Sequence, residues 1–131
     1  MYRCGVDWVG VTDLDLLFSS DWSDTSDEFK AYGARRMIGD PVADADKFKA
    51  TSPTGNVGKI RAPVLLAYGG KDRRVPIEHG ERLRDALKAQ AGAKAEWIVY
   101  KDEGHGWRSV ETHIDFWNRV ARFLDANIGA H

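Results

Sequence analysis

An aspartate and a histidine each follow a strand-like segment of this sequence. Asp72 lies in a glycine-led turn after the apolar run 64–68, and His105 lies between two glycines after the run 95–101. Because the carboxyl ends of parallel strands meet at one edge of an open α/β sheet, we expect the two side chains to lie together. A carboxylate that fixes the tautomer of a histidine lets the ring act as a base. The pair therefore predicts the second half of a nucleophilic triad.

Each residue alone has a simpler interpretation. An aspartate after a strand usually caps a turn or a helix, and a histidine beside glycines is often a hydrogen-bonded loop residue. Arg73 and Arg74 are interpreted as a solvated pair at the rim, with contact to a substrate carboxylate as the alternative. Trp107 either lines a substrate pocket or packs on the last helix. The placement of Asp72 and His105 on consecutive strands favours the triad.

The elements that must position this pair are predicted from apolar periodicity. The apolar run 64–68 shows no alternation, which is typical of a strand covered on both faces. Two further strands are predicted, from Cys4 to Val11 and over 95–101. Helices are predicted over 28–38 with Ser26 or Asp27 as the cap, over 78–90, and from Ser109 onward. The order of these elements predicts an α/β fold: about three parallel strands in a three-layer arrangement with flanking helices.

The helical segments carry finer predictions. In the last helix, apolar residues recur at spacings of 4, 3, 4, 3 and 4, which predicts a buried face formed by Val110, Ile114, Trp117, Ala121, Leu124 and Ile128. In the helix over 78–90, Glu78 and Arg82 are expected to pair. The segment 42–58 is expected to form loops and short helical turns.

Composition narrows the classes of function. The 131 residues, with a formal net charge of -1, predict a single unit over 1–131 and argue against nucleic-acid or membrane partners. The single cysteine, Cys4, excludes an internal disulfide and a CxxC zinc site, and we interpret it as a buried strand residue. The glycine loops match no nucleotide-binding motif. Because the histidines also lack ligand spacing (His79, His105, His113 and His131), we expect no metal and no cofactor.

The two loops resemble those of the prolyl oligopeptidase family. The segment 69–76, GGKDRRVP, resembles the family's G-x-x-D-x-x-V-P motif, and 100–106, YKDEGHG, resembles its histidine loop. The segments 50–53 and 60–66 resemble the lead-in to the aspartate strand. The resemblance implies an α/β-hydrolase fold, Asp72 as the triad acid, His105 as the general base, and hydrolysis of peptide or acyl bonds by the parent enzyme.

The nucleophile that the resemblance implies is absent from this sequence. No glycine begins a G-x-S-x-G motif, and the serines lie in polar loops or at a cap. We therefore expect the C-terminal part of a hydrolase domain that lacks the N-terminal strands and the nucleophile elbow, and that is inactive in isolation. No signal-peptide pattern precedes the first strand, which favours the cytoplasm while leaving the compartment of the parent open.

Two alternatives belong to other classes of function. The strand from Cys4 to Val11 lacks a local partner on one side, so the chain could be a non-catalytic interaction module that forms homo-oligomers through this edge or docks on a missing N-terminal partner. A complete small enzyme with Cys4 as the nucleophile is the other alternative. Against it, Cys4 lies at the start of its strand, whereas reactive groups in this layout lie at the carboxyl ends.

Overall fold

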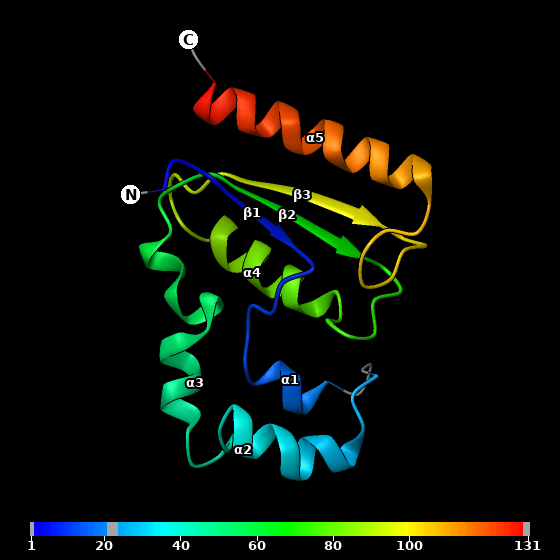
Figure 1. Ribbon diagram of the computed structural model, residues 1–131. Coiled ribbons are helices and arrows are strands. Elements are labelled where there is room, and N and C mark those ends of the chain that lie inside the picture. The colour runs from blue at the N-terminus through cyan, green and yellow to red at the C-terminus, as the bar shows by residue number, and fades with distance from the viewer. Residues whose placement is uncertain (1, 21–23, 130–131) are drawn as a thin grey trace.

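The computed structural model describes residues 2–20 and 24–129. Strands alternate with helices along the chain, and an excursion of short helices separates the first strand from the second (Figure 1). In chain order the elements are β1 (Gly5–Trp8), α1 (Leu16–Ser19), the π-helical segment η1 (Phe29–Ala34), α2 (Arg35–Met37), α3 (Ala45–Thr51), the 3₁₀ segment η2 (Pro53–Lys59), β2 (Val64–Gly69), α4 (Glu78–Lys88), β3 (Ala95–Tyr100) and α5 (Val110–Ile128).

The three strands form a parallel sheet in the order β1-β2-β3. Val64 is the register partner of both Gly5 on β1 and Ala95 on β3. The central strand β2 is the most buried, and its residues from Leu65 to Tyr68 have no exposed surface. An apolar run without alternation suits a strand that is covered on both faces, so the predicted parallel sheet of three strands is confirmed.

Helices α4 and α5 lie on opposite faces of this sheet (Figure 1). Alternate residues of β2 enter two separate clusters, because successive side chains of a strand point to opposite faces. Leu66 and Tyr68 pack with Leu83 and Leu87 of α4. The cluster on the other face consists of Leu65, Ala67, Ile98, Trp107, Phe116, Val120 and Phe123. The layers are therefore α/β/α, as predicted.

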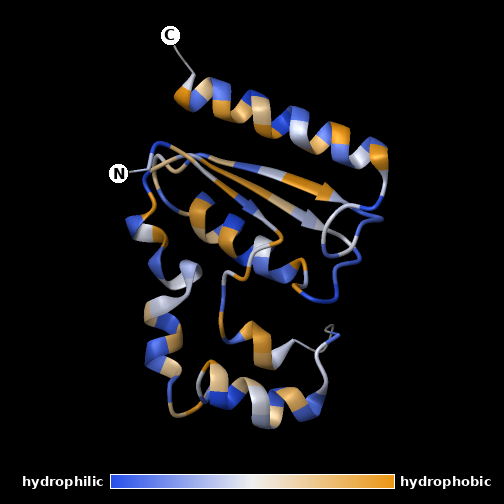
Figure 2. Ribbon diagram, viewed as in Figure 1, coloured by the Kyte–Doolittle hydropathy of each residue, from blue (hydrophilic) through white to orange (hydrophobic). Residues whose placement is uncertain are grey.

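Helix α5 buries a different face from the one predicted. Phe116, Val120 and Phe123 are buried, whereas Val110 and Ile114 are 66% and 58% exposed. Trp117 is 52% exposed and Ile128 is 54% exposed. Apolar and polar residues are interspersed along the whole helix (Figure 2). The sequence carries two apolar stripes at helical spacing, and the stripe with the two phenylalanines fills the space above the sheet.

The first strand is shorter than predicted, because the chain turns at Val9. This residue has a φ of 49°, in the left-handed region that β-branched residues avoid. Cys4, which was predicted to be a buried strand residue, lies just before β1 and is half-buried against the cluster on the α5 face of the sheet.

The segment between β1 and β2 forms a helical lobe on the α4 side of the sheet (Figure 1). The helix predicted over 28–38 is divided into η1 and α2, and the hydroxyl of Ser26 accepts a hydrogen bond from the N–H of Phe29. The segment 42–58 contains α3 and most of η2, in agreement with the prediction of short helical turns. Phe18 stacks on Phe48 with ring centroids 5.6 Å apart.

Candidate functional site

Asp72 and His105 lie in contact at the carboxyl edge of the sheet. His105 Nδ1 is 2.9 Å from Asp72 Oδ2. The other carboxylate oxygen, Oδ1, accepts hydrogen bonds from the N–H groups of Arg74 and Val75, each at 2.9 Å. Asp72 is 1% exposed. Because these two N–H groups belong to the turn that carries Asp72, the turn holds the carboxylate in one orientation.

The two loops that carry this pair are joined through their backbones. The N–H of Gly70 donates to the carbonyl of Tyr100, and the N–H of Lys71 donates to the carbonyl of Glu103, both at 2.9 Å. This close approach requires glycine at position 69, because an added Cβ would overlap the carbonyl oxygens of Glu103 and Gly104. Adjacent parallel strands thus bring together two residues that are 33 positions apart.

His105 differs from Asp72 in its accessibility. The side chain of His105 is 42% exposed, whereas that of Asp72 has no exposed surface. Gly106, the next residue, has a φ of 94°, and Gly104 and Gly106 form an isolated backbone bridge across the histidine. The arrangement presents one half-open imidazole whose Nδ1 faces a buried carboxylate. Such a ring can accept and return a proton at Nε2.

His113 has a structural contact. His113 Nε2 lies 2.7 Å from the carbonyl of Trp107, and His131 lies outside the described residues. Over residues 2–20 and 24–129, no group of three or more His, Cys, Asp or Glu side chains has a geometry that could hold a metal ion. No helix in the same ranges is long and apolar enough to cross a membrane.

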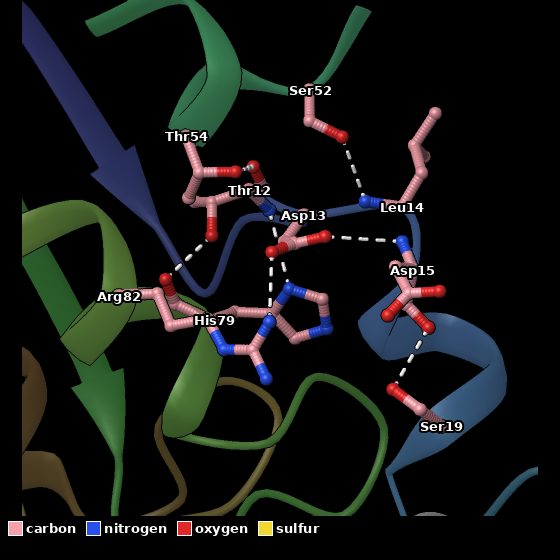
Figure 3. Close-up of polar contacts among 9 residues, drawn as sticks. All are labelled: Thr12, Asp13, Leu14, Asp15, Ser19, Ser52, Thr54, His79 and Arg82. Atoms are coloured by element: carbon pink, nitrogen blue, oxygen red, sulfur yellow. Dashed lines mark hydrogen bonds and ion pairs between the residues drawn. The ribbon is translucent and has the colours of Figure 1, made fainter. Parts of the chain in front are cut away.

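His79 belongs to a buried polar cluster that no local pattern in the sequence indicates. It has no exposed surface, its Nδ1 accepts the N–H of Thr12 at 3.3 Å, and its carbonyl accepts the Thr12 hydroxyl (Figure 3). Burial lowers the pKa of His79 to about 4. Asp13, beside Thr12, pairs with Arg82 at 3.0 Å, so the predicted pairing of Arg82 with Glu78 is wrong. These hydrogen bonds and this ion pair join the loop after β1 to helix α4.

A second polar contact, which is partly buried, lies at the end of β1. The hydroxyl of Tyr68 is 2.7 Å from Asp7 Oδ2 and 2.8 Å from the carbonyl of Gly10. Burial raises the pKa values of Asp7 and Tyr68, because it disfavours their charged forms. Because Asp7 and Tyr68 are 61 positions apart, no local sequence signal joins them.

Trp107 and Arg74 are two further candidate residues from the sequence. Trp107 is buried against Phe116 of α5 and Trp8 of β1, with ring centroids 5.4 and 5.8 Å apart, which agrees with the packing interpretation. Arg74 pairs with Asp24 at 3.1 Å, and both side chains are partly exposed. This ion pair is consistent with the interpretation of Arg74 as a rim residue.

Two serines of the polar loops have structural roles in a turn and at a helix cap. The Ser109 hydroxyl caps α5 by accepting the N–H of Thr112 at 3.2 Å, and the Ser52 hydroxyl accepts the N–H of Leu14 at 2.9 Å. Ser23 lies outside the described residues. Within 2–20 and 24–129, the hydrogen bond of the His105 side chain goes to Asp72, and none goes to a serine.

Known proteins resemble this chain in sequence. A model of the prolyl oligopeptidase family matches residues 1–131. Dipeptidyl aminopeptidase BIII from Pseudoxanthomonas mexicana is 32% identical over 133 residues, covering 98% of this chain and 18% of that protein. The acylamino-acid-releasing enzyme of Arabidopsis thaliana is 30% identical over 115 residues, covering 86% of this chain and 14% of that protein.

A solved structure shows the same fold. The acylaminoacyl peptidase of Pyrococcus horikoshii superposes with a TM-score of 0.84 at 18% identity, covering 99% of this chain and 21% of that chain. This chain therefore spans between 14% and 21% of the length of these three peptidases. Its three parallel strands and flanking helices form part of an α/β-hydrolase fold.

Proposed function

Because this chain belongs to the prolyl oligopeptidase family of serine peptidases, we propose that it supplies the acid and the base of a hydrolase that cleaves peptide or acyl bonds. In this proposal Asp72 is the triad acid and His105 is the general base. The observation that carries it is the 2.9 Å contact between His105 Nδ1 and Asp72 Oδ2, at a carboxylate whose other oxygen is held by two backbone N–H groups.

The roles follow from the positions of the protons. Nδ1–H donates to Asp72, which leaves the lone pair of Nε2 free to take a proton from a nucleophilic hydroxyl. His105 then returns that proton to the leaving group. Asp72 stabilises the imidazolium that exists between these two steps. The nucleophile and the oxyanion-hole donors come from a segment outside residues 1–131, so the chain alone performs no turnover.

A chimera tests this proposal. The segment of dipeptidyl aminopeptidase BIII that aligns with this chain is replaced by residues 1–131, and hydrolysis of chromogenic aminoacyl and acyl esters is measured. The chimera should be active, the isolated chain should not, and His105→Ala should lower the activity of the chimera by about 10³-fold or more. His113→Gln is the matched control, because His113 contacts a carbonyl and not Asp72; it should keep most of the activity.

Two results would count against the proposal. One is a folded chimera in which His105→Ala retains its activity. The other is turnover by the isolated chain that His105→Ala abolishes, which would mean that this chain holds its own nucleophile.

The free edge of β1 supports a second candidate, an interaction module that self-associates. Among the described residues β1 pairs with β2 on one side and with no strand on the other. Val6 and Trp8 on this strand are 39% and 37% exposed. An open edge with apolar side chains recruits other strands. This function would need neither Asp72 nor His105.

A further inference from the structure

Glu103 forms hydrogen bonds at both ends of the loop that carries His105, the proposed base. It lies two residues before His105, and its carboxylate reaches the far end of the same loop. Oε2 accepts the N–H of Arg108 at 2.7 Å, and Oε1 accepts the N–H of Ser109 at 3.1 Å. His105 therefore lies inside a ring that is closed by these two hydrogen bonds.

The backbone of Glu103 is also fixed at both of its polar groups. Its N–H donates to the carbonyl of Tyr100 at 3.1 Å, at the end of β3. Its carbonyl accepts the N–H of Lys71 at 2.9 Å, and Lys71 directly precedes Asp72. Glu103 is 6% exposed. One buried residue thus joins the end of β3, the Asp72 turn and the start of α5.

Apart from its contact with Asp72, the side chain of His105 is weakly restrained. Its side chain is 42% exposed, and glycines flank it on both sides, which gives the loop more conformational freedom than other residues would. We propose that Glu103 is a positioning residue: its carboxylate clamps the loop so that His105 Nδ1 stays on Asp72 Oδ2. This inference rests on the proposed roles of Asp72 and His105.

Capping of α5 does not explain both contacts. The helix begins at Val110 and already has Ser109 as its cap, through the hydroxyl that accepts the N–H of Thr112. The N–H of Arg108 precedes the helix, and its bond to Glu103 is the shorter of the two. The N–H groups of Arg108 and then Ser109 lower the pKa of Glu103, so the clamp is ionised at neutral pH. A carboxylate can accept both N–H groups at once, whereas an amide side chain offers one oxygen.

The test is NMR of the whole 131-residue chain with ¹⁵N-labelled histidine at neutral pH. In the native chain His105 should be the Nδ1–H tautomer. The side chain of Glu103→Gln has one acceptor oxygen instead of two, so one of the two loop N–H groups loses its acceptor. The Nδ1–H tautomer should then become a mixture with the Nε2–H tautomer. The amide protons of Arg108 and Ser109 should exchange with solvent about tenfold faster. Asp102→Asn is the matched control: Asp102 is the neighbouring carboxylate, but it pairs with Lys71 at the surface, and both readouts should stay unchanged.

Glu103→Asp separates clamping from charge. It keeps the negative charge but is one methylene shorter, so the clamp predicts the same loss of tautomer as in Glu103→Gln, whereas a purely electrostatic effect predicts none. The proposal is overturned if folded Glu103→Gln keeps the native tautomer, or if both variants fail to fold, which would make Glu103 a structural residue only. A native chain without the Nδ1–H tautomer would instead contradict the roles proposed for Asp72 and His105.

Discussion

Asp72 divides its two carboxylate oxygens between the backbone and the histidine. One oxygen accepts two N–H groups of its own turn, and the other faces His105 Nδ1. Because two N–H groups of the turn hold one oxygen of the carboxylate, the position of the oxygen that faces the imidazole follows from the fold of residues 69–76. The placement of the two residues after neighbouring strands predicted that they lie together, and the structure has them in contact.

His79 predicts how stability depends on pH. Its pKa is about 4 in the folded chain because of burial, against a usual value of 6.5. Between pH 4 and 6.5 the unfolded chain binds more protons than the folded chain, so the free energy of unfolding rises with pH over this range. It has its full value above pH 6.5. It should fall by about 2–3 kcal/mol as the pH drops to 4. Urea denaturation over this pH range measures the effect.

The control for this prediction is His79→Gln, which keeps an acceptor for the N–H of Thr12 but does not titrate. Its free energy of unfolding should vary less over the same pH range. An identical pH dependence in both proteins would show that other groups cause the loss of stability.

At the level of elements, the contact between the β2 and β3 loops depends on a glycine. Gly69→Ala would place a methyl group against the carbonyl oxygens of Glu103 and Gly104. We expect a loss of about 1–3 kcal/mol in the free energy of unfolding, measured by thermal or urea denaturation. In Gly104→Ala the nearest atom to the new Cβ is the Lys71 carbonyl oxygen at 3.8 Å, so stability should change by about 0.5 kcal/mol or less. Equal losses in the two variants would contradict the close-approach argument.

The sequence predicts those elements whose signal is local. The strand β2 is one continuous apolar run, and Ser109 stands where a cap is needed, so β2 and the start of α5 could be found without a structure. The buried face of α5 could not, because Val110 and Phe116 belong to two different apolar stripes, and which stripe meets the sheet is set by tertiary packing.

The same limit applies to the site. Asp72 and His105 were found because each follows a strand, and neighbouring parallel strands end at one edge. The contact of Thr12 with His79 joins residues 67 positions apart with no repeated motif, so only the fold brings them together. Glu103 lay within the histidine loop, but the sequence shows no sign that its side chain would reach Arg108.

At the scale of the whole molecule, the free edge of β1 predicts self-association. Light scattering over a concentration series should show oligomers, and Val6→Lys should weaken them, because a charged side chain opposes edge pairing. Tyr32→Lys is the matched control, since Tyr32 is 77% exposed and lies in η1, away from this edge. A chain that stays monomeric at every concentration would contradict the second candidate function without affecting the first.

The measurement that tests the central claim most directly is the tautomer of His105 in the native chain and in Asp72→Asn. The two backbone N–H groups at Oδ1 would keep the asparagine oxygen in that position, which turns its NH₂ group toward His105 Nδ1. Histidine NMR at neutral pH should therefore show Nδ1–H in the native chain and Nε2–H in the variant. The same tautomer in both proteins would contradict the claim that Asp72 sets the proton position of the base.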